Sequence, residues 1–463
     1  MKTFFTKSAL YLALTIPAFF FLGCDDSEEG GSYEFSVEPT VLTFSAKQET
    51  QTLSVRTYGD WSIVLPQDAA WLKVSAMSGR GPAEIEVTAE NYYRTDTSRT
   101  ARLTVTGGNS GDFHVEVVQR KLQMNDLSAA GKANCYIVPT SGDFVIDAAT
   151  QGNSESEQVG EWTSAELLWE DNRELITDLY GDPESKRIFF STAAAGNAVI
   201  AVKDASGKIL WSWHIWATDF DPNAKTLKYT NDNGSTWEFM DRNLGAANAE
   251  SGSFGAFGLL YQWGRKDPFT AATAFAPENP SETIRWNMLN NPLPAMASDA
   301  DSMGTVQLSI EHPTSFYVTR YAHGDWNGQP DPNRWGAVSG QKTVYDPCPA
   351  GWRVPAYDAQ GDSPYAFVTR QTTTGTDNIG RIYTDGNGND FLFPVAGSRV
   401  NGTGTLDCPG NYGSLWTATG KTTSNEDGTI EYGCLLFFTT GRLVSATYYD
   451  TRSQGVSVRC VKE

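Results

Sequence analysis

A chain of 463 residues is long enough for about three domains of the usual ~100–200 residues each. Its net charge of −20 argues against nucleic acid or an anionic headgroup surface as a partner. Only 19% of the residues are charged, whereas the chain holds 43 glycines and 12% aromatic residues. Frequent turns and many aromatic side chains predict a mainly β, extracellular protein.

The first 23 residues have the order of a secretory signal. Lys2 and Lys7 precede an apolar run over residues 9–22, and the small residue Gly23 follows it. The run is too short, and too abruptly ended by acidic residues, for a typical membrane-spanning helix. We therefore expect a signal peptide over residues 1–23.

Cys24 directly follows the expected cleavage point, and acidic residues occupy much of 25–29. The arrangement resembles the lipobox of bacterial lipoproteins, although Phe21 departs from its usual Leu, and the acidic run resembles the surface-export signal of Bacteroidetes lipoproteins. The resemblance implies an acylated Cys24, an acidic tether over 24–32, and a lipid-anchored protein exposed at the outer membrane surface. The alternative is an ordinary signal peptide with an incidental cysteine.

The pattern of residues 33–121 predicts a β-sandwich, because short segments alternate between apolar and polar residues and are separated by turn residues. These segments are residues 33–37, 51–55, 84–87, 101–105 and 114–117.

Several landmarks occur in this segment in a fixed order. They are Trp61 in GDWSI, Trp71 in WLKVS, the SGRG at 78–81, the stretch 91–99 and the closing VVQ at 117–119. Together they resemble the BACON domain, an immunoglobulin-like module of Bacteroidetes surface proteins. The resemblance implies carbohydrate binding, which is proposed for that family. The alternative is a spacer in which Trp61 and Trp71 are core residues.

Residues 122–222 predict a second immunoglobulin-like sandwich. The runs 133–138, 144–146 and 196–202 lead to a tight turn at 204–207 and an antiparallel return over 209–216. This pattern resembles a small sandwich common in Bacteroidetes surface proteins, for which no activity is assigned.

Strand alternation over residues 209–216 puts Trp211 and Trp213 on one face, where we expect the core, and His214 and Trp216 on the other. His214 is expected to be a hydrogen-bonded structural residue. Trp216 is therefore the surface candidate in this strand.

Residues 223–463 form the largest segment, with many loops. Its landmarks are NLG at 243–245, YQWGR at 261–265, DPCPAGWRVP at 346–355, GSR at 397–399, GSLWT at 413–417 and SVRCV at 457–461. In this order they resemble the Fibrobacter major-paralogous domain, which is related to C-type-lectin-like and formylglycine-generating-enzyme-like folds. The resemblance implies an α+β, C-type-lectin-like domain.

Five cysteines remain after Cys24, so at least one thiol is free or pairs outside the chain. None has metal-ligand spacing, and we expect one or two disulfides and a free Cys135. The resemblance implies a bridge between Cys348 and Cys460, with Cys408 and Cys434 as candidates for a second one.

No residue is predicted to be catalytic. The chain has no nucleophile elbow, HExxH, P-loop or GxGxxG motif, and its four histidines lie in different surroundings. An active-site role for Cys408 and Cys434, as in formylglycine-generating enzymes, or a glycosidase carboxylate pair remains an alternative to a non-enzymatic protein.

Residues 385–390, with the sequence DGNGND, place side-chain oxygens at alternate positions, as a calcium loop would. The candidate ligands are Asp385, Asn387, Asn389 and Asp390. The preferred alternative is a hairpin turn, because DG and NG dipeptides favour such turns and the closing Glu of an EF-hand is missing. We therefore predict no cofactor, with calcium as the open alternative.

The sugar-binding motif of C-type lectins has an echo in the sequence QPD, which holds Gln329 and Asp331. Nearby Trp326 and Trp335 could supply a stacking face, so this loop is the candidate glycan site. Residues 301–303, with the sequence DSM, match a short Bacteroidetes O-glycosylation pattern and indicate an exposed loop.

The sequence thus predicts a mainly β protein with two immunoglobulin-like sandwiches followed by an α+β, C-type-lectin-like domain. The predicted function is non-catalytic binding of glycans or mucin glycoproteins, of host or dietary origin, strengthened by many copies on one surface. The alternative is an adhesin or structural surface component that recognises protein and has no sugar pocket.

Overall fold

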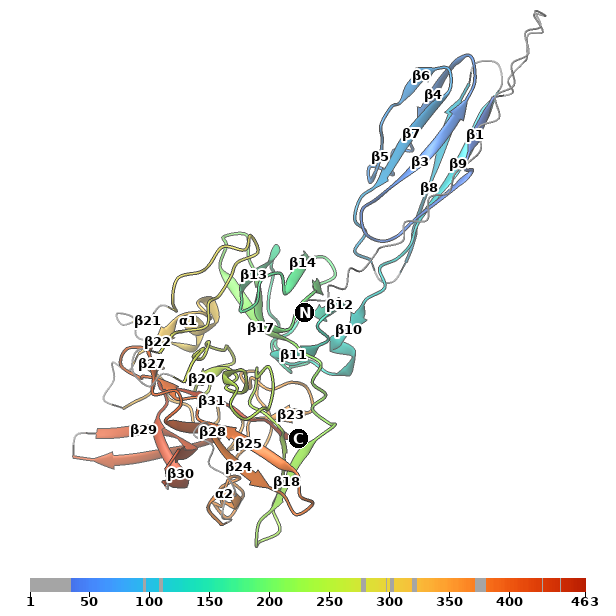
Figure 1. Cartoon of the computed structure of the whole chain (residues 1–463). Helices are drawn as coiled ribbons and strands as arrows, with labels where there is room; N and C mark the ends of the chain where they lie inside the picture. Colours follow the sequence, from blue (N-terminus) through green and yellow to red (C-terminus); the bar gives the residue numbers. More distant parts are fainter. Residues whose placement is uncertain are drawn as a thin grey trace, which may run out of the picture. The chain divides into compact units, whose positions relative to one another are not determined.

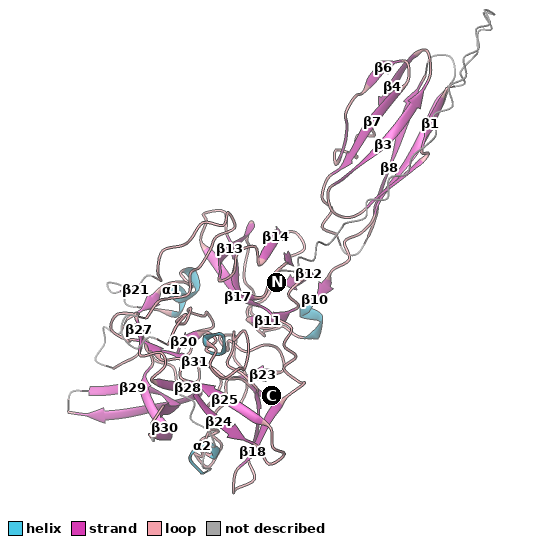
Figure 2. Cartoon of the chain, in the orientation of Figure 1, coloured by secondary structure: helices cyan, strands magenta, loops and turns pink. Residues whose placement is uncertain are grey.

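The computed structural model describes residues 35–463 except 95–96, 108–110, 276–279, 297, 300–303, 319–322, 371–379, 427 and 442. The predicted signal peptide, Cys24, the acidic tether and the 301–303 motif lie outside the described residues. The chain divides into two compact units, residues 1–122 and residues 123–463. Strands dominate both units, which confirms the mainly β class (Figure 2). Among the described residues, no helix is long and apolar enough to cross a membrane.

The first unit is a sandwich of two sheets, as the alternating segments predicted. All strand pairs are antiparallel except β2 with β9, which is parallel. One sheet has the order β1 (Ser36–Glu38), β3 (Glu49–Arg56), β7 (Ala83–Ala89), β5 (Leu72–Val74). The other has the order β2 (Val41–Phe44), β9 (Asp112–Gln119), β8 (Arg99–Thr106), β4 (Asp60–Val64), β6 (Ser78–Arg80).

Both tryptophans of the first unit contribute to packing. Trp61 is 4% exposed in the core between the sheets, and its indole N–H donates to the Gly81 carbonyl at 3.0 Å. Trp71 is partly buried against the same core, with the Arg99 guanidinium 4.2 Å from its ring centroid. These contacts favour the spacer interpretation of the two side chains.

Gly79 offers a direct test of the Trp61 packing. A Cβ at this position would lie 2.4 Å from Trp61 Cζ2, and the rigid indole cannot move aside. We expect Gly79→Ala to destabilise the first unit by ~1–3 kcal/mol, the usual cost of overpacking. Gly59→Ala is the control and should be nearly neutral, because the nearest atom would be 3.7 Å away. Hydrogen exchange of β3 and β7 in the whole protein measures both, and equal exchange in the two variants would contradict the prediction.

The second unit begins with another sandwich of two four-stranded sheets (Figure 1). The predicted antiparallel return is confirmed, with Ile200 of β16 opposite Trp213 of β17. One sheet has the order β10 (Asn125–Asp126), β12 (Gly142–Asp147), β15 (Arg187–Thr192), β14 (Ile176–Asp182), and a 3₁₀ turn, η2 (Leu127–Ala130), follows β10. The other has the order β11 (Cys135–Val138), β17 (Ile209–Ala217), β16 (Gly196–Lys203), β13 (Ser164–Glu170).

The sheet containing β17 is covered on both faces. Trp211 and Trp213 point into the sandwich core, as predicted. Trp216 is 1% exposed and belongs to the other core, formed with residues 223–463, so its assignment to the surface is wrong. His214 is structural, as predicted: its Nε2 lies 3.0 Å from Asn197 Oδ1, and burial lowers its pKa to about 3.

The remaining residues form several sheets (Figure 1). Their buried side chains form two cores. A four-stranded sheet has the order β18 (Thr226–Thr230), β19 (Thr236–Met240), β32 (Val461–Lys462), β23 (Trp352–Arg353). A seven-stranded sheet has the order β27 (Leu406–Asp407), β26 (Ser398–Arg399), β31 (Gly455–Ser457), β28 (Tyr412–Asn425), β29 (Gly428–Thr439), β30 (Val444–Thr451), and β20 (Leu260–Gln262) also pairs with β31. Two small pairs are β21 (Ser298–Asp299) with β22 (Phe316–Tyr317), and β24 (Gly380–Thr384) with β25 (Asp390–Pro394). The helical segments here are short: α1 (Val306–Glu311), α2 (Phe367–Arg370) and the 3₁₀ turn η3 (Phe254–Ala256).

Buried polar contacts join the second sandwich to residues 223–463. The Asn134 amide donates to the carbonyls of Val344 and Asp346, at 2.7 and 2.8 Å. Ser212 Oγ donates to the buried Asp267 carboxylate at 2.6 Å. Because such contacts add to a shared apolar core, the two segments form a single compact unit.

Candidate functional site

The tryptophans of the predicted glycan loop do not form a surface. Trp326 and Trp335 are 2% and 1% exposed, and the Trp335 ring lies 5.6 Å from that of Trp263. The Trp326 indole N–H donates to the Trp263 carbonyl at 2.7 Å. The prediction that these two rings stack on a sugar is therefore wrong, because both are used to pack the loop onto the core.

The polar residues of the same loop are exposed but separate from those rings. Gln329 is exposed, and its carbonyl accepts a hydrogen bond from the Asn327 amide. Asp331 lines a polar groove of about 360 Å³ together with Glu157 and Tyr345. Of the four predicted residues, Asp331 thus lines a concave surface.

The disulfide implied by the resemblance is confirmed. Cys348 and Cys460 are bridged, because β32 pairs with β23 and brings the end of the chain beside the CPAGW segment. Cys135 is a free thiol, as predicted.

A second bridge between Cys408 and Cys434 is not formed, and both thiols are free. Cys408 directly follows β27, whereas Cys434 lies in β29, four strand positions away in the same sheet. At ~4.8 Å per strand this places them roughly 19 Å apart, well beyond the ~7 Å Cα separation that a disulfide tolerates. The same separation prevents them from forming a two-cysteine active site.

The candidate calcium loop folds as the turn of the β24–β25 hairpin. Asp385 Oδ1 accepts from the backbone N–H groups of Asn387 and Asn389, at 2.9 and 2.8 Å. The Asp390 carboxylate accepts from the Thr384 hydroxyl at 2.7 Å. The hairpin interpretation, which the sequence favoured, is confirmed.

A strip of aromatic rings crosses the outer edge of the seven-stranded sheet. The ring centroids of Phe437 and Tyr448 lie 4.9 Å apart, and those of Tyr432 and Tyr449 also lie 4.9 Å apart. Tyr412 lies 5.5 Å from Phe437, and Tyr448 lies 6.2 Å from Tyr449. We call these five residues the aromatic strip. Tyr448 and Tyr449 are 44% and 38% exposed, which is unusual for large rings in this chain.

The strip is held by its strands. Neighbouring residues of a strand point to opposite faces, so Tyr448 and Tyr449 of β30 extend the strip around the edge of the sheet. In Figure 1, β29 and β30 lie side by side at the red end of the chain. The Lys421 ammonium lies 3.7 Å from the Tyr449 ring centroid, which adds a cation at one end of the strip. The adjacent tyrosines in TYYDT were the signal in the sequence that could have indicated it.

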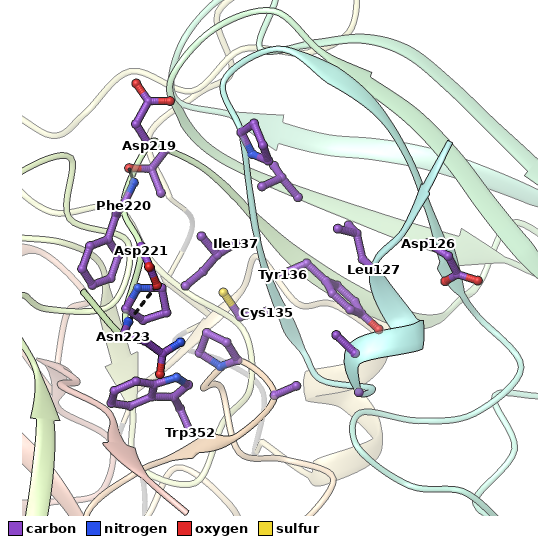
Figure 3. Close-up of a pocket in the computed structure, with 18 residues that line it drawn as sticks. Asp126, Leu127, Cys135, Tyr136, Ile137, Asp219, Phe220, Asp221, Asn223 and Trp352 are labelled. Carbon is purple, nitrogen blue, oxygen red and sulfur yellow. Dashed lines mark hydrogen bonds between the residues drawn. The ribbon is translucent and has the colours of Figure 1, made fainter. Parts of the chain in front are cut away.

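A cavity of about 640 Å³ in the second unit lies along β11 (Figure 3). Phe220, Asp221 and Trp352 line one side, and Asp126 and Leu127 line the other. Its lining comes from three segments far apart in the sequence: 126–139, 218–223 and 349–352.

The electrostatic character of this cavity is apolar within and acidic at the rim. Burial raises the pKa of the Cys135 thiol well above its usual value, so the thiol stays protonated and adds to the apolar wall. The Asp126 carboxylate pairs with Arg187. Asp219 and Asp221 are exposed, and no ion pair to either occurs in the described part of the chain. Within that same part, no group of three or more His, Cys, Asp or Glu residues could hold a metal ion.

Comparisons with solved structures give partial matches. A Bacteroides ovatus GH5 xyloglucanase in complex with a XXXG heptasaccharide matches with 25% identity over 23% of this chain and 27% of that chain, at a TM-score of 0.18. This chain therefore spans about a quarter of the xyloglucanase. A protein from Bacteroides thetaiotaomicron matches with 19% identity over 22% of this chain and 100% of that one, at a TM-score of 0.16. No curated protein matches the chain.

One family model matches, and it falls within the first unit. The matched family is BACON, described as "Putative binding domain, N-terminal", over residues 61–120. The order of landmarks around Trp61 and Trp71 had indicated the same family. The match to the family model thus supports the BACON part of that expectation, over residues 61–120.

Proposed function

We propose that this chain is a lipid-anchored protein of the bacterial cell surface that binds carbohydrate and catalyses no reaction. The observation that carries the carbohydrate part is the aromatic strip. The C–H face of a pyranose stacks on an aromatic ring, and such rings are effective when a rigid scaffold holds them in place. Tyr448 and Tyr449 offer exposed rings on a hydrogen-bonded sheet.

Polar groups beside the strip support the same proposal. The Lys421 ammonium and the phenol hydroxyls can hydrogen-bond to sugar hydroxyls or to an acidic sugar. Single stacking contacts of this kind are weak, and many copies of the protein on one surface would strengthen its binding to host mucin or dietary glycans. The BACON match supports a binding role for the chain. The lipid anchor rests on the sequence around Cys24, which matches the order of a lipoprotein signal.

The test is binding of the purified protein to an array of glycans and mucins, with and without EDTA. Replacing both Tyr448 and Tyr449 by alanine should weaken binding about tenfold or more, as expected for exposed aromatic anchors. Replacing both by phenylalanine keeps the rings and should retain most of the binding. Tyr180→Ala is the matched control, because Tyr180 is equally exposed, at 38%, but lies outside the strip.

The outcomes separate the alternatives. Binding that persists without the two rings would contradict the strip as the site. Binding that EDTA abolishes would support a calcium lectin and return attention to residues 385–390. An array with no binding would overturn the carbohydrate proposal and leave the protein-recognising adhesin as the leading function.

A further inference from the structure

The cavity in Figure 3 lies along an open strand edge. β11 pairs with β17, and no other strand of the described residues pairs with it. The lining includes the consecutive residues 135–139. Tyr136 and Val138 belong to the sandwich core, whereas Cys135 and Ile137 pack with the other core. Because residues from both faces of the strand line it, the cavity meets β11 at its edge.

Strand geometry specifies which backbone groups face this cavity. The His214 N–H donates to the Asn134 carbonyl, and the Thr218 N–H donates to the Val138 carbonyl. In a parallel pair, alternate residues of a strand bond to the same neighbour. Asn134, Tyr136 and Val138 therefore bond to β17, and the N–H and C=O of Ile137 point to the opposite edge. An unpaired edge of this kind is a template for another extended segment.

The walls define what such a segment carries. Phe220 and Trp352 lie on one side, and Leu127 lies on the other. Apolar side chains on either face of an added strand would therefore contact apolar residues of the cavity wall. Asp219 and Asp221 stand at the rim without an ion pair among the described residues, and they favour a cation. The acidic residues at 25–29 of this chain would be repelled there, so its own N-terminal segment is a poor occupant.

We propose that this cavity captures an extended peptide segment of a partner protein, which adds as a strand to β11 and directs a lysine or arginine side chain to Asp219 and Asp221. The volume of about 640 Å³ lies within the range of ligand sites in proteins. Pro139 has no N–H to donate, which limits the added pairing to the short stretch before it. The site is distinct from the aromatic strip, because no residue of the strip lines this cavity.

The test begins with selection from a phage-displayed library of random heptapeptides on the purified whole protein. Selected peptides should combine β-branched residues with lysine or arginine. A synthetic selected peptide should bind about tenfold or more weakly to a protein carrying both Asp219→Asn and Asp221→Asn, with the loss reduced at high salt. N-methylation of alternate peptide nitrogens should abolish binding, because it removes the hydrogen bonds of an added strand.

Two variants at one position test the strand edge. Ile137→Pro removes the N–H that faces the cavity without touching the bonds to β17, and should abolish binding. Ile137→Val keeps that N–H and is the control. If the Ile137→Pro protein does not fold, the aspartate variants and hydrogen exchange of the unmodified protein still test the proposal. On peptide binding, the Ile137 amide should gain protection from hydrogen exchange, whereas the Tyr136 amide, already bonded to β17, should change little.

Several results would overturn the proposal. The first two are selection of no peptide and selection of acidic peptides. The other two are peptide binding that the aspartate variants leave unchanged, and protection from hydrogen exchange that appears only outside residues 135–139. The alanine variant of Tyr448 and Tyr449 should bind the peptide normally, so failure of the carbohydrate proposal and failure of this one are distinguishable.

Discussion

Replacing Cys348 and Cys460 together by alanine is expected to lower the free energy of unfolding of the second unit by about 4–5 kcal/mol. The bridge joins residues separated by 112 positions. In the chain-entropy model, removing a link of that length frees the unfolded chain by this amount at 25 °C. Both cysteines are fully buried, so alanine avoids placing a new polar group in the core. The bridge holds the last strand, β32, beside β23, and its loss should free the end of the chain first.

Urea unfolding followed by tryptophan fluorescence measures this loss, since all but Trp61 and Trp71 of the 14 tryptophans lie in residues 123–463. The matched control replaces Cys408 and Cys434 by alanine, which removes two free thiols and no bridge. The control should cost far less, about 1–2 kcal/mol for the shortened side chains. Equal losses in the two proteins would contradict the prediction that the Cys348–Cys460 bridge stabilises the second unit.

The strands of both sandwiches could be predicted from the sequence because their signal is local. Residues 101–105 and 209–216 alternate in polarity, and they form β8 and β17 with nearly the same bounds. Alternation reports which residues share a face, but not what covers that face. The expectation that Trp216 is a surface residue fails for this reason, because the core that holds it is built largely from distant residues such as Met240 and Trp263, in addition to Phe220, whose ring centroid lies 5.4 Å from that of Trp216.

The candidate site could not be predicted in the same way. Trp326 and Trp335 lie in a loop without periodicity, where polar neighbours such as Asp331 make buried rings look exposed. The aromatic strip joins Tyr412 to Tyr448 through strand pairing, and no spacing in the sequence encodes that contact. The cavity at β11 is built from three distant segments, so neither its walls nor the open edge has a local signal.

The Asn134 amide makes three of the buried polar contacts at the junction that builds this cavity, and Asn134→Ala should lower the free energy of unfolding of the second unit by about 3–5 kcal/mol. Asn134 is 2% exposed, and its side chain donates to the carbonyls of Val344 and Asp346 and accepts the indole N–H of Trp211 at 3.0 Å. Alanine leaves three buried polar groups without partners, each costing ~1–3 kcal/mol, partly offset by relaxation. The carbonyls cannot be solvated easily, since burial here is strong enough to raise the pKa of Asp346 to about 6.

Asn153→Ala is the matched control for this prediction. Asn153 also joins the second sandwich to residues 223–463, but with one amide bond of 3.2 Å to the Lys342 carbonyl at a partly exposed position. We expect it to cost about 1 kcal/mol, because water can replace the lost partner. The same urea unfolding measures both variants, and hydrogen exchange of β11 reports on the cavity wall. Since Asn134 directly precedes β11, its loss should also weaken peptide binding at the open edge, whereas Asn153→Ala should not. Equal stability of the two variants would contradict the prediction that the Asn134 contacts stabilise the junction.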